Sequence, residues 1–345
     1  MNYTIIVLFG GPSDERHVSV ASAQNVVRAL ATSAKERPFA WFWAPNGAVH
    51  DVALDDLLTH ERPFEVDFVP TRPAIFPNIE QALDTIPVED PVFFLALHGT
   101  GGEDGPLQRM FESRGIPFTG SNSTTSEIAF DKERAKERVR GKLRIAESRV
   151  AQPNELRNVV SDMLSRHARV VAKPLAGGSS RGLFFLDRGA AVPQVDIPYI
   201  VEQFIAGREL TDGVVDMGDG PIALPVIEIE TDPGRDFDYA GKYLGHGTRE
   251  ICPAQIPDAL AREVQEAARI AHEALGCDGY SRSDFVGAAD GVYYLETNTL
   301  PGLTRASLVP QELAAAGISF RDFLLRQTKL AVERRPPLHS VTILV

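Results

Sequence analysis

Cysteine is almost absent from this 345-residue sequence, which contains only Cys252 and Cys277. Neither residue belongs to a Cys-x-x-Cys pair, so the sequence predicts neither a disulfide framework nor a cysteine-based zinc site. Unpaired thiols are typical of proteins in a reducing compartment, and we therefore expect a cytoplasmic protein.

Long hydrophobic runs are also lacking. The longest strongly apolar run covers residues 92–97, whereas about 20 apolar residues are needed to span a bilayer. No basic segment precedes an apolar stretch at the beginning of the sequence, so we expect no signal peptide and no membrane association.

Positive charge is scarce relative to negative charge. The sequence has 35 Lys and Arg residues against 47 Asp and Glu residues, which gives a net charge of −12. Since sequence-independent nucleic-acid binding begins from a basic surface, this balance argues against a nucleic-acid partner. It does not argue against a single basic pocket for a small anion, because net charge says nothing about one cleft.

The order of the predicted elements favours an α/β fold with some α+β parts. An apolar strand at 3–9, a glycine turn and a helix at 19–30 form the opening of an α/β unit. Further strands are predicted at 92–97, 116–119, 169–173, 183–186 and 199–205, helices at 105–114, 123–143 and 258–275, and a hairpin at 279–298.

These elements predict three domains and a tail. We expect an open α/β domain over residues 1–120, a small α+β domain over 121–206 and a third domain over 207–332. The remaining residues, 333–345, are expected to form a tail that adds an edge strand.

The predicted hairpin carries the strongest chemical signal. Arg282 and Asp284 are two residues apart on its first strand, and so are Glu296 and Asn298 on its second, so each pair shares one face of its strand. If residues 289–291 form the loop and end on a left-handed glycine, Asp284 lies opposite Glu296. Two carboxylates and an amide oxygen then converge, which suits Mg²⁺ bound together with nucleotide phosphates. A cross-strand salt bridge on a solvated face explains the pattern equally well.

A glycine-rich segment, residues 173–182, follows a predicted strand and begins with Lys173. Its backbone N–H groups and flanking basic residues can bind phosphates, although the P-loop spacing is absent. The segment also contains a Gly-x-Ser-x-Gly sequence centred on Ser180, which is typical of serine hydrolases. That motif must lead into a helix, whereas residues 183–186 are predicted to be a strand. A lid over phosphates is therefore favoured, and a plain hairpin turn is the alternative.

Three other residues stand out by their position in the sequence. Lys132 lies in a charge run, 131–136, of the kind that usually forms a solvated helix face. His98 directly follows a buried strand, where ligands gather in open α/β sheets. Glu15 follows the first strand, where it can hold an ammonium group or simply complement the helix dipole.

Taken together and in this order, the motifs resemble the D-alanine–D-alanine ligase family of the ATP-grasp superfamily over about residues 3–330. The motifs that carry the resemblance lie at 10–16, 98–105, 119–121, 131–132, 173–180, 207–209, 242–243, 252–254, 282–285 and 296–304. No single motif is decisive, but so many in one order are highly specific. The resemblance implies that ATP lies between the central and C-terminal domains, with the N-terminal domain on the substrate side.

The resemblance also implies a role for each of a set of residues. Lys132 and Lys173 would contact nucleotide phosphates, which reverses the surface interpretation of Lys132. Residues expected near the adenosine are Glu202, Phe204, Ile205 and Glu209. Residues expected to bind two Mg²⁺ ions, with Mn²⁺ as a substitute, are Asp284, Glu296 and Asn298.

The remaining implied roles concern the two substrates. Glu15 would hold the ammonium group of the first D-alanine, with Ser179 and Tyr243 completing the hydrogen-bonded set. Lys242 and Ser307 would address the carboxylate of the second. His98 would lie near the first substrate, and Arg282 and the backbone N–H of Gly302 would stabilise developing charge.

The implied activity is ATP-dependent ligation of two D-alanine molecules to D-alanyl-D-alanine through an acyl phosphate, for peptidoglycan precursors, by a homodimer. The sequence departs from the family pattern at 240–241, Gln203, Thr297 and Arg181. These departures keep open a related carboxylate–amine ligase for a different amino acid or hydroxy acid. A non-catalytic nucleotide-binding protein would be indicated by a missing metal ligand or phosphate lysine, and none is missing.

Overall fold

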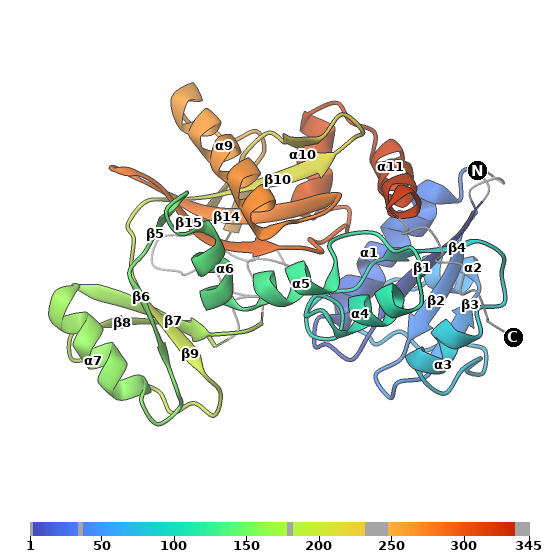
Figure 1. The fold of residues 1–345 in the computed structure, drawn as a ribbon, viewed down its shortest axis with the longest axis horizontal. Coiled ribbons are helices and arrows are strands. Elements are labelled where there is room, and N and C mark those ends of the chain that lie inside the picture. Colours follow the sequence, from blue (N-terminus) through green and yellow to red (C-terminus); the bar gives the residue numbers. More distant parts are fainter. Residues whose placement is uncertain (1–2, 34–36, 178–181, 232–247, 335–345) are drawn as a thin grey trace, which may run out of the picture.

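The computed structural model describes residues 3–33, 37–177, 182–231 and 248–334. Within these ranges the chain forms a four-stranded, a seven-stranded and a second four-stranded sheet. The three sheets follow one another along the long axis of the molecule, with the seven-stranded sheet between the other two (Figure 1). The predicted mixture of α/β and α+β parts is confirmed.

The first sheet is built by the beginning of the chain. Its strands, in spatial order, are β3 (Val49–Val52), β2 (Phe39–Trp43), β1 (Thr4–Gly10) and β4 (Pro91–Leu95). β1 is parallel to both β2 and β4, and β2 is antiparallel to β3. The predicted opening is confirmed, since β1 leads through a glycine turn into α1 (Arg16–Leu30).

Two features of this region differ from the predicted elements. The aromatic strand β2 is absent from the prediction, and the predicted strand at 116–119 makes only an isolated bridge between Phe93 and Phe118. The short helices that accompany the first sheet are α2 (Leu54–Leu58), α3 (Ile79–Asp84) and α4 (Pro106–Ser113).

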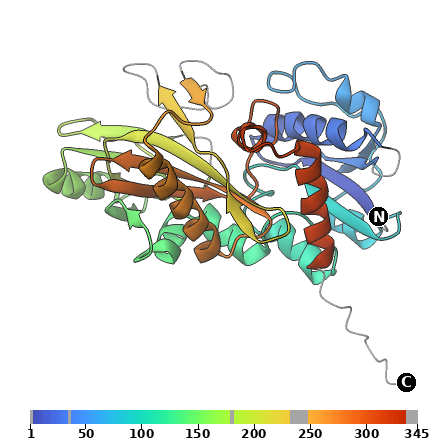
Figure 2. The same cartoon turned by 90° about the horizontal axis from the view of Figure 1, so that it is seen from above.

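The last helix of the chain packs on this first sheet. α11 (Phe320–Glu333) contacts α1 and β4, and Figures 1 and 2 show it beside α1. Its residues Phe323 and Leu324 are fully buried in the same hydrophobic core as the strands. The predicted tail therefore begins too early, because Glu333 is helical. The edge strand expected in the tail falls on residues 335–345, which lie outside the described residues.

The second four-stranded sheet is antiparallel throughout. Its strands, in spatial order, are β6 (Ser148–Ala151), β9 (Tyr199–Gln203), β7 (Arg169–Pro174) and β8 (Phe184–Asp187). The last three confirm the strands predicted in this region, although β9 ends at Gln203 rather than at residue 205. α7 (Leu156–Arg166) packs its apolar side against this sheet.

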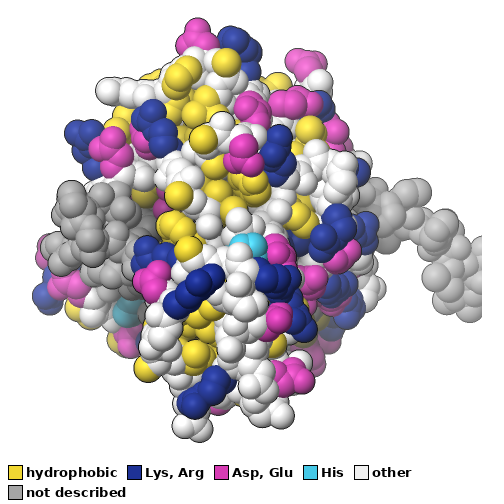
Figure 3. Space-filling model, turned by 90° about the vertical axis from the view of Figure 1, so that its left-hand side faces the viewer, with side chains coloured by type: hydrophobic (Ala, Val, Ile, Leu, Met, Phe, Trp, Pro, Cys, Tyr) yellow, Lys and Arg dark blue, Asp and Glu magenta, His cyan; other side chains and the backbone are white. Residues whose placement is uncertain are grey.

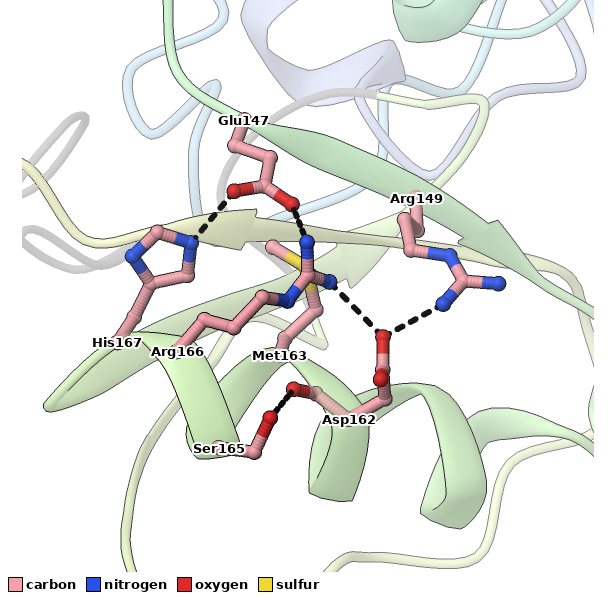
Figure 4. Close-up of polar contacts among 7 residues, drawn as sticks. All are labelled: Glu147, Arg149, Asp162, Met163, Ser165, Arg166 and His167. Carbon is pink, nitrogen blue, oxygen red and sulfur yellow. Dashed lines mark hydrogen bonds and ion pairs between the residues drawn. The ribbon is translucent and has the colours of Figure 1, made fainter.

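Exposed ion pairs connect α7 with β6 and with the residue that precedes it. Glu147 accepts hydrogen bonds from His167 and Arg166, and Asp162 accepts from Arg166 and Arg149 (Figure 4). We call these five residues the surface network.

The seven-stranded sheet occupies the middle of the molecule. Its strands are β13 (Thr248–Ile251), β12 (Ile227–Thr231), β10 (Arg208–Asp216), β14 (Tyr280–Ala288), β15 (Gly291–Asn298) and β5 (Arg144–Ile145), with β11 (Pro221–Ala223) beside β10. α9 (Asp258–Leu275) covers it with the apolar face that the sequence predicts over 258–275. α10 (Leu308–Ala315) contacts β10.

The predicted helix over 123–143 is two helices, α5 (Ser123–Phe130) and α6 (Lys132–Val139). Asp131 separates them, because its backbone is extended (ψ 111°) and its carboxylate accepts hydrogen bonds from the N–H groups of Glu133 and Arg134. An aspartate in this position begins a new helix rather than continuing the old one. Both helices contact α9 and β15, so they pack on the seven-stranded sheet.

Among the described residues no helix has the length and apolar character needed to cross a membrane.

Candidate active site

The hairpin β14–β15 has the predicted register at its chemical residues. Asp284 lies opposite Glu296, and Arg282 lies opposite Asn298. The predicted loop is nevertheless wrong, because Ala288 pairs with Gly291 and only two residues form the turn. The extra residue is accommodated by a β-bulge next to Asp284, which restores the alignment that the shorter turn would shift by one position.

Asp284 is buried and hydrogen-bonded on both carboxylate oxygens. Arg282 donates from Nε to Oδ1 and from Nη2 to Oδ2, at 3.0 Å in each case. Thr211, its neighbour on β10, donates from Oγ1 to Oδ1 at 2.6 Å. The two carboxylates share a face, as predicted. The alternative of a cross-strand salt bridge on a solvated face is wrong, because Arg282 pairs with Asp284 on its own strand and Asp284 is buried.

Lys132 reaches the hairpin from the first turn of α6. Its Nζ lies 3.5 Å from Oε2 of Glu296 and donates to the backbone oxygen of Gly177 at 2.5 Å. Burial lowers the pKa of Lys132, and Glu296 partly opposes this shift. The interpretation of this charge run as a solvated face is therefore wrong, and Lys132 connects the hairpin to the start of the glycine-rich segment.

Lys173 enters from β7 and pairs with Glu202 on the neighbouring strand β9, at 2.9 Å between Nζ and Oε2. The other oxygen of Glu202 pairs with Lys136 of α6. Burial alone would raise the pKa of Glu202, but Lys173 and Lys136 together hold it below its ordinary value. Burial alone would lower the pKa of Lys173, but Glu202 and Glu296 together raise it.

Lys136 is a buried site residue that is not among the predicted site residues. Its spacing of four residues from Lys132 is the only signal in the sequence, because residues four apart lie on the same helix face. Asp284 and Glu296 both act electrostatically on Lys173. Side chains from the hairpin, from α6 and from β7 therefore meet in one space.

The other residues expected near adenosine lie where the chain leaves β9 for β10. Phe204 and Ile205 are half-buried in this connection, and Glu209 is the second residue of β10. The backbone N–H of Phe204 donates to the oxygen of Arg169 at 3.2 Å. The guanidinium of Arg169 lies 5.0 Å from the ring of Phe204, an arrangement that fixes this connection against β7.

On the substrate side, His98 joins the first sheet to the loop after β15. Its Nε2 lies 2.9 Å from Oγ of Ser22, and its Nδ1 lies 3.0 Å from the backbone oxygen of Leu300. Burial lowers the pKa of His98, so the ring is neutral near pH 7. Glu15 is close by, since a Cβ on Gly99 would come within 2.5 Å of its Oε2.

The same loop carries Gly302 and Ser307. A Cβ on Gly302 would come 2.7 Å from Oγ of Ser307, so any larger residue would displace that hydroxyl. Ser307 Oγ also accepts a hydrogen bond from the backbone N–H of Thr304 at 3.1 Å. Ser179, Lys242 and Tyr243 lie outside the described residues, as do Ser180, Arg181 and 240–241.

Two buried acids near Arg282 are also absent from the predicted set. Glu103 accepts from the N–H of Gly99 at 2.8 Å, and Glu312 accepts from the N–H of Gly213 at 2.9 Å. Burial raises the pKa of each to about 8. Each is therefore mainly protonated at pH 7.

The hairpin residues fit a magnesium ion by the chemistry of their donors. Among the described residues no group of three or more His, Cys, Asp or Glu side chains is arranged to hold a metal ion. Asp284, Glu296 and Asn298 supply only two carboxylates and one amide oxygen. That small set of hard oxygens is what Mg²⁺ uses when phosphates complete its coordination.

Comparison with known proteins agrees with this geometry. The family model described as D-ala D-ala ligase N-terminus matches residues 4–121, and the one described as D-ala D-ala ligase C-terminus matches 158–327. A D-alanine–D-alanine ligase of Syntrophobacter fumaroxidans is 37% identical over 342 residues, covering 96% of this chain and 98% of the relative. That of Cupriavidus metallidurans is 36% identical and covers 93% of this chain and 89% of the relative.

Solved structures show the same architecture. The VanG D-Ala:D-Ser ligase from Enterococcus faecalis has a TM-score of 0.78 at 27% identity, covering 96% of this chain and 100% of that one. The Bacillus anthracis D-alanine–D-alanine ligase complexed with ATP has a TM-score of 0.71 at 25% identity, covering 96% and 98%. The predicted ATP-grasp fold is confirmed, and the chain belongs to the D-alanine–D-alanine ligase family.

Proposed function

We infer that the chain is an ATP-dependent D-alanine–D-alanine ligase, which joins two D-alanine molecules and forms ADP and phosphate. The observation that carries this conclusion is the meeting of the acidic hairpin, through Asp284 and Glu296, with Lys132 and Lys173 from two other elements. Relatives that match nearly the full chain bear the same name. The product serves the synthesis of peptidoglycan precursors.

The first chemical problem is that a carboxylate is a poor electrophile, because its negative charge repels an amine. We propose that the γ-phosphate of ATP is transferred to the first D-alanine, which gives an acyl phosphate with a good leaving group. Lys132 and Lys173 bind the phosphates and neutralise their charge as it moves. Glu202, Phe204, Ile205 and Glu209 are proposed to line the adenosine side.

The second step is attack by the amine of the second D-alanine. Glu15 holds the ammonium group of the first substrate, assisted by Ser179 and Tyr243, and neutral His98 positions it without adding charge. Lys242 and Ser307 hold the carboxylate of the second. Arg282 and the N–H of Gly302 donate to the developing oxyanion, a contribution of the kind that is worth about 3–4 kcal/mol.

Asp284, Glu296 and Asn298 are proposed to hold Mg²⁺, two ions by the family resemblance, with Mn²⁺ as a substitute. The bound metal supplies further neutralisation of phosphate charge. Arg282 pairs with Asp284 in the structure through Nε and Nη2; because a guanidinium has five N–H donors, this pair does not use all of them.

Four further points are proposals that the family resemblance supports. The chain divides into domains over 1–120, 121–206 and 207–332, with ATP between the second and third, and the tail follows α11, which ends at Glu333. The enzyme works in the cytoplasm and forms a homodimer. Size-exclusion chromatography with light scattering tests the last point, and a monomer at micromolar concentration would contradict it.

The function is tested by phosphate release from ATP across D- and L-amino acids, singly and in pairs. D-alanine alone should support turnover and yield D-alanyl-D-alanine. The relatives from Syntrophobacter fumaroxidans and Cupriavidus metallidurans are named D-alanine–D-alanine ligases, so they do not favour the alternative of a ligase for another amino acid or hydroxy acid. It would replace the present conclusion if D-alanine gave no turnover while another pair did.

A further inference from the structure

Lys136 has no part in the function described above, although its side chain is completely buried. It lies on α6 one turn after Lys132, and its ammonium group pairs with Glu202. The second oxygen of Glu202 lies 2.9 Å from Nζ of Lys173. One buried carboxylate is thus shared by two lysines, only one of which is proposed to bind phosphate.

The two lysine partners of Glu202 differ in how accessible their side chains are to a ligand. The side chain of Lys173 is 10% exposed, whereas that of Lys136 is 0% exposed. Lys132, the other lysine assigned to phosphate, is 8% exposed and is paired with Glu296. Lys136 is therefore the least accessible of the three lysines.

A phosphate that binds Lys173 competes with Glu202 for the same ammonium group. If Glu202 had no other partner, this competition would leave a buried carboxylate uncompensated, which is strongly unfavourable. Lys136 removes that penalty, because it stays paired with Glu202 whatever Lys173 does.

We propose that Lys136 is a positioning residue, the fixed counter-ion of Glu202 that frees Lys173 to bind nucleotide phosphates. This role rests on the proposed function, because it assumes that Lys173 contacts the nucleotide. Its effect falls on nucleotide affinity, since Lys136 itself touches neither phosphate nor amino acid.

The test is isothermal titration calorimetry of the full chain with Mg²⁺ and a non-hydrolysable ATP analogue that has an imido bridge between its β- and γ-phosphates. The variant Lys136→Met should bind the analogue about tenfold more weakly, within the range of couplings measured for contacting charged residues. Lys142→Met is the matched control, because Lys142 is exposed and follows the same helix. It should bind like the unaltered chain, and equal affinities in both variants would overturn the proposal.

A double-mutant cycle separates this role from a general effect on packing. In a Glu202→Gln background no buried carboxylate needs a counter-ion, so adding Lys136→Met should change affinity by less than about twofold. A tenfold loss in that background would overturn the proposal, because Lys136 would then act independently of Glu202. The double variant removes both charges and keeps the comparison available even if Lys136→Met alone does not fold.

Lys173→Met distinguishes failure of this inference from failure of the proposed function. If Lys173→Met binds the analogue as tightly as the unaltered chain, Lys173 does not contact the nucleotide, and both the proposed function of this site and the role of Lys136 are wrong. If Lys173→Met weakens binding while Lys136→Met does not, only the role of Lys136 is wrong.

Discussion

Two sets of ion pairs in this protein have the same pattern but lie in opposite surroundings. In the surface network, Asp162 is shared by Arg149 and Arg166, and the side chains of Asp162 and Arg149 are 49% and 51% exposed. In the buried cluster, Glu202 is shared by Lys136 and Lys173, and its side chain is 5% exposed. The two sets have similar contacts. Water and salt screen the charges of the surface network, but they hardly reach the charges around Glu202.

The surroundings of the surface network are visible on the face of the molecule in Figure 3, which is the left-hand end in Figure 1. Basic and acidic side chains are interspersed there, as on most soluble surfaces. The hydrogen bond from Arg149 lowers the pKa of Asp162, but each partner retains water as an alternative. A buried carboxylate has no such alternative, so its protein partners determine whether it can carry a charge at all.

The largest effect is expected where a buried carboxylate is also proposed to act in the chemistry. Glu296→Gln should lower kcat by about 10³-fold or more, because it removes a carboxylate that is proposed to hold Mg²⁺ against the phosphates. Phosphate release with D-alanine measures the rate, and circular dichroism checks that the fold persists. Glu266→Gln on the exposed side of α9 is the control. A rate near normal in Glu296→Gln would contradict the metal assignment.

The next prediction compares the loss of a buried charge with the loss of an exposed one. Lys136→Met should lower the free energy of unfolding by about 3–5 kcal/mol, because it leaves Glu202 with one partner in a buried site. Urea unfolding measures the change. Lys142→Met, at an exposed position, should stay within about 0.5 kcal/mol of the unaltered chain. A similar loss of unfolding free energy in the two variants would mean that a buried charge contributes no more to stability than an exposed one.

A third prediction concerns pH. Burial raises the pKa of Glu103 and Glu312 to about 8, whereas in the unfolded chain both ionise near pH 4.5. Between these values the native state holds protons that the unfolded state has lost, so the free energy of unfolding falls as pH rises. The slope is about 1.4 kcal/mol per pH unit for each group.

The decrease in the free energy of unfolding with rising pH should be measured by urea unfolding at pH 6, 7 and 8. Glu312→Gln should make the slope smaller without abolishing it, because the neutral amide does not titrate over this range while Glu103 still does. Asp162→Asn should leave the slope unchanged, since that carboxylate is exposed. Stability that is constant or rises over this range would show that the two buried acids are not protonated in the native state.

The smallest effect is expected in the surface network. Arg149→Gln should cause no measurable change in the unfolding midpoint or in the rate of ADP formation, because exposed ion pairs contribute little. The same urea and turnover assays apply. A clear loss of activity would instead show that the network controls the position of β6 and, through it, β9 and Glu202.

The elements that the sequence predicts well are those whose signal is local. The spacing of Val264, Ala267 and Ala271 on one face predicts the helix that the structure has at α9. Period-two geometry places Asp284 and Glu296 on the faces of their strands, and their alignment is as predicted although the turn is not.

The parts that escape prediction depend on partners far away in the chain. Lys136 looks like one charge of a solvated run until β9 brings Glu202 against it. The boundary between α5 and α6 depends on Asp131, which caps the second helix. In the sequence, Asp131 looks like one more charged residue of the run 131–136. Glu103 and Glu312 owe their raised pKa values to burial, which no local pattern reveals.

The packing of α11 against the first sheet has a consequence for biosynthesis. The strands β1 to β4 leave the ribosome before the helix whose Phe323 and Leu324 share their hydrophobic core. Until it arrives, the earliest part of the chain must expose apolar surface, a condition that favours aggregation. A nascent chain interrupted before residue 320 would therefore lack part of the hydrophobic core of a sheet that has already been synthesised.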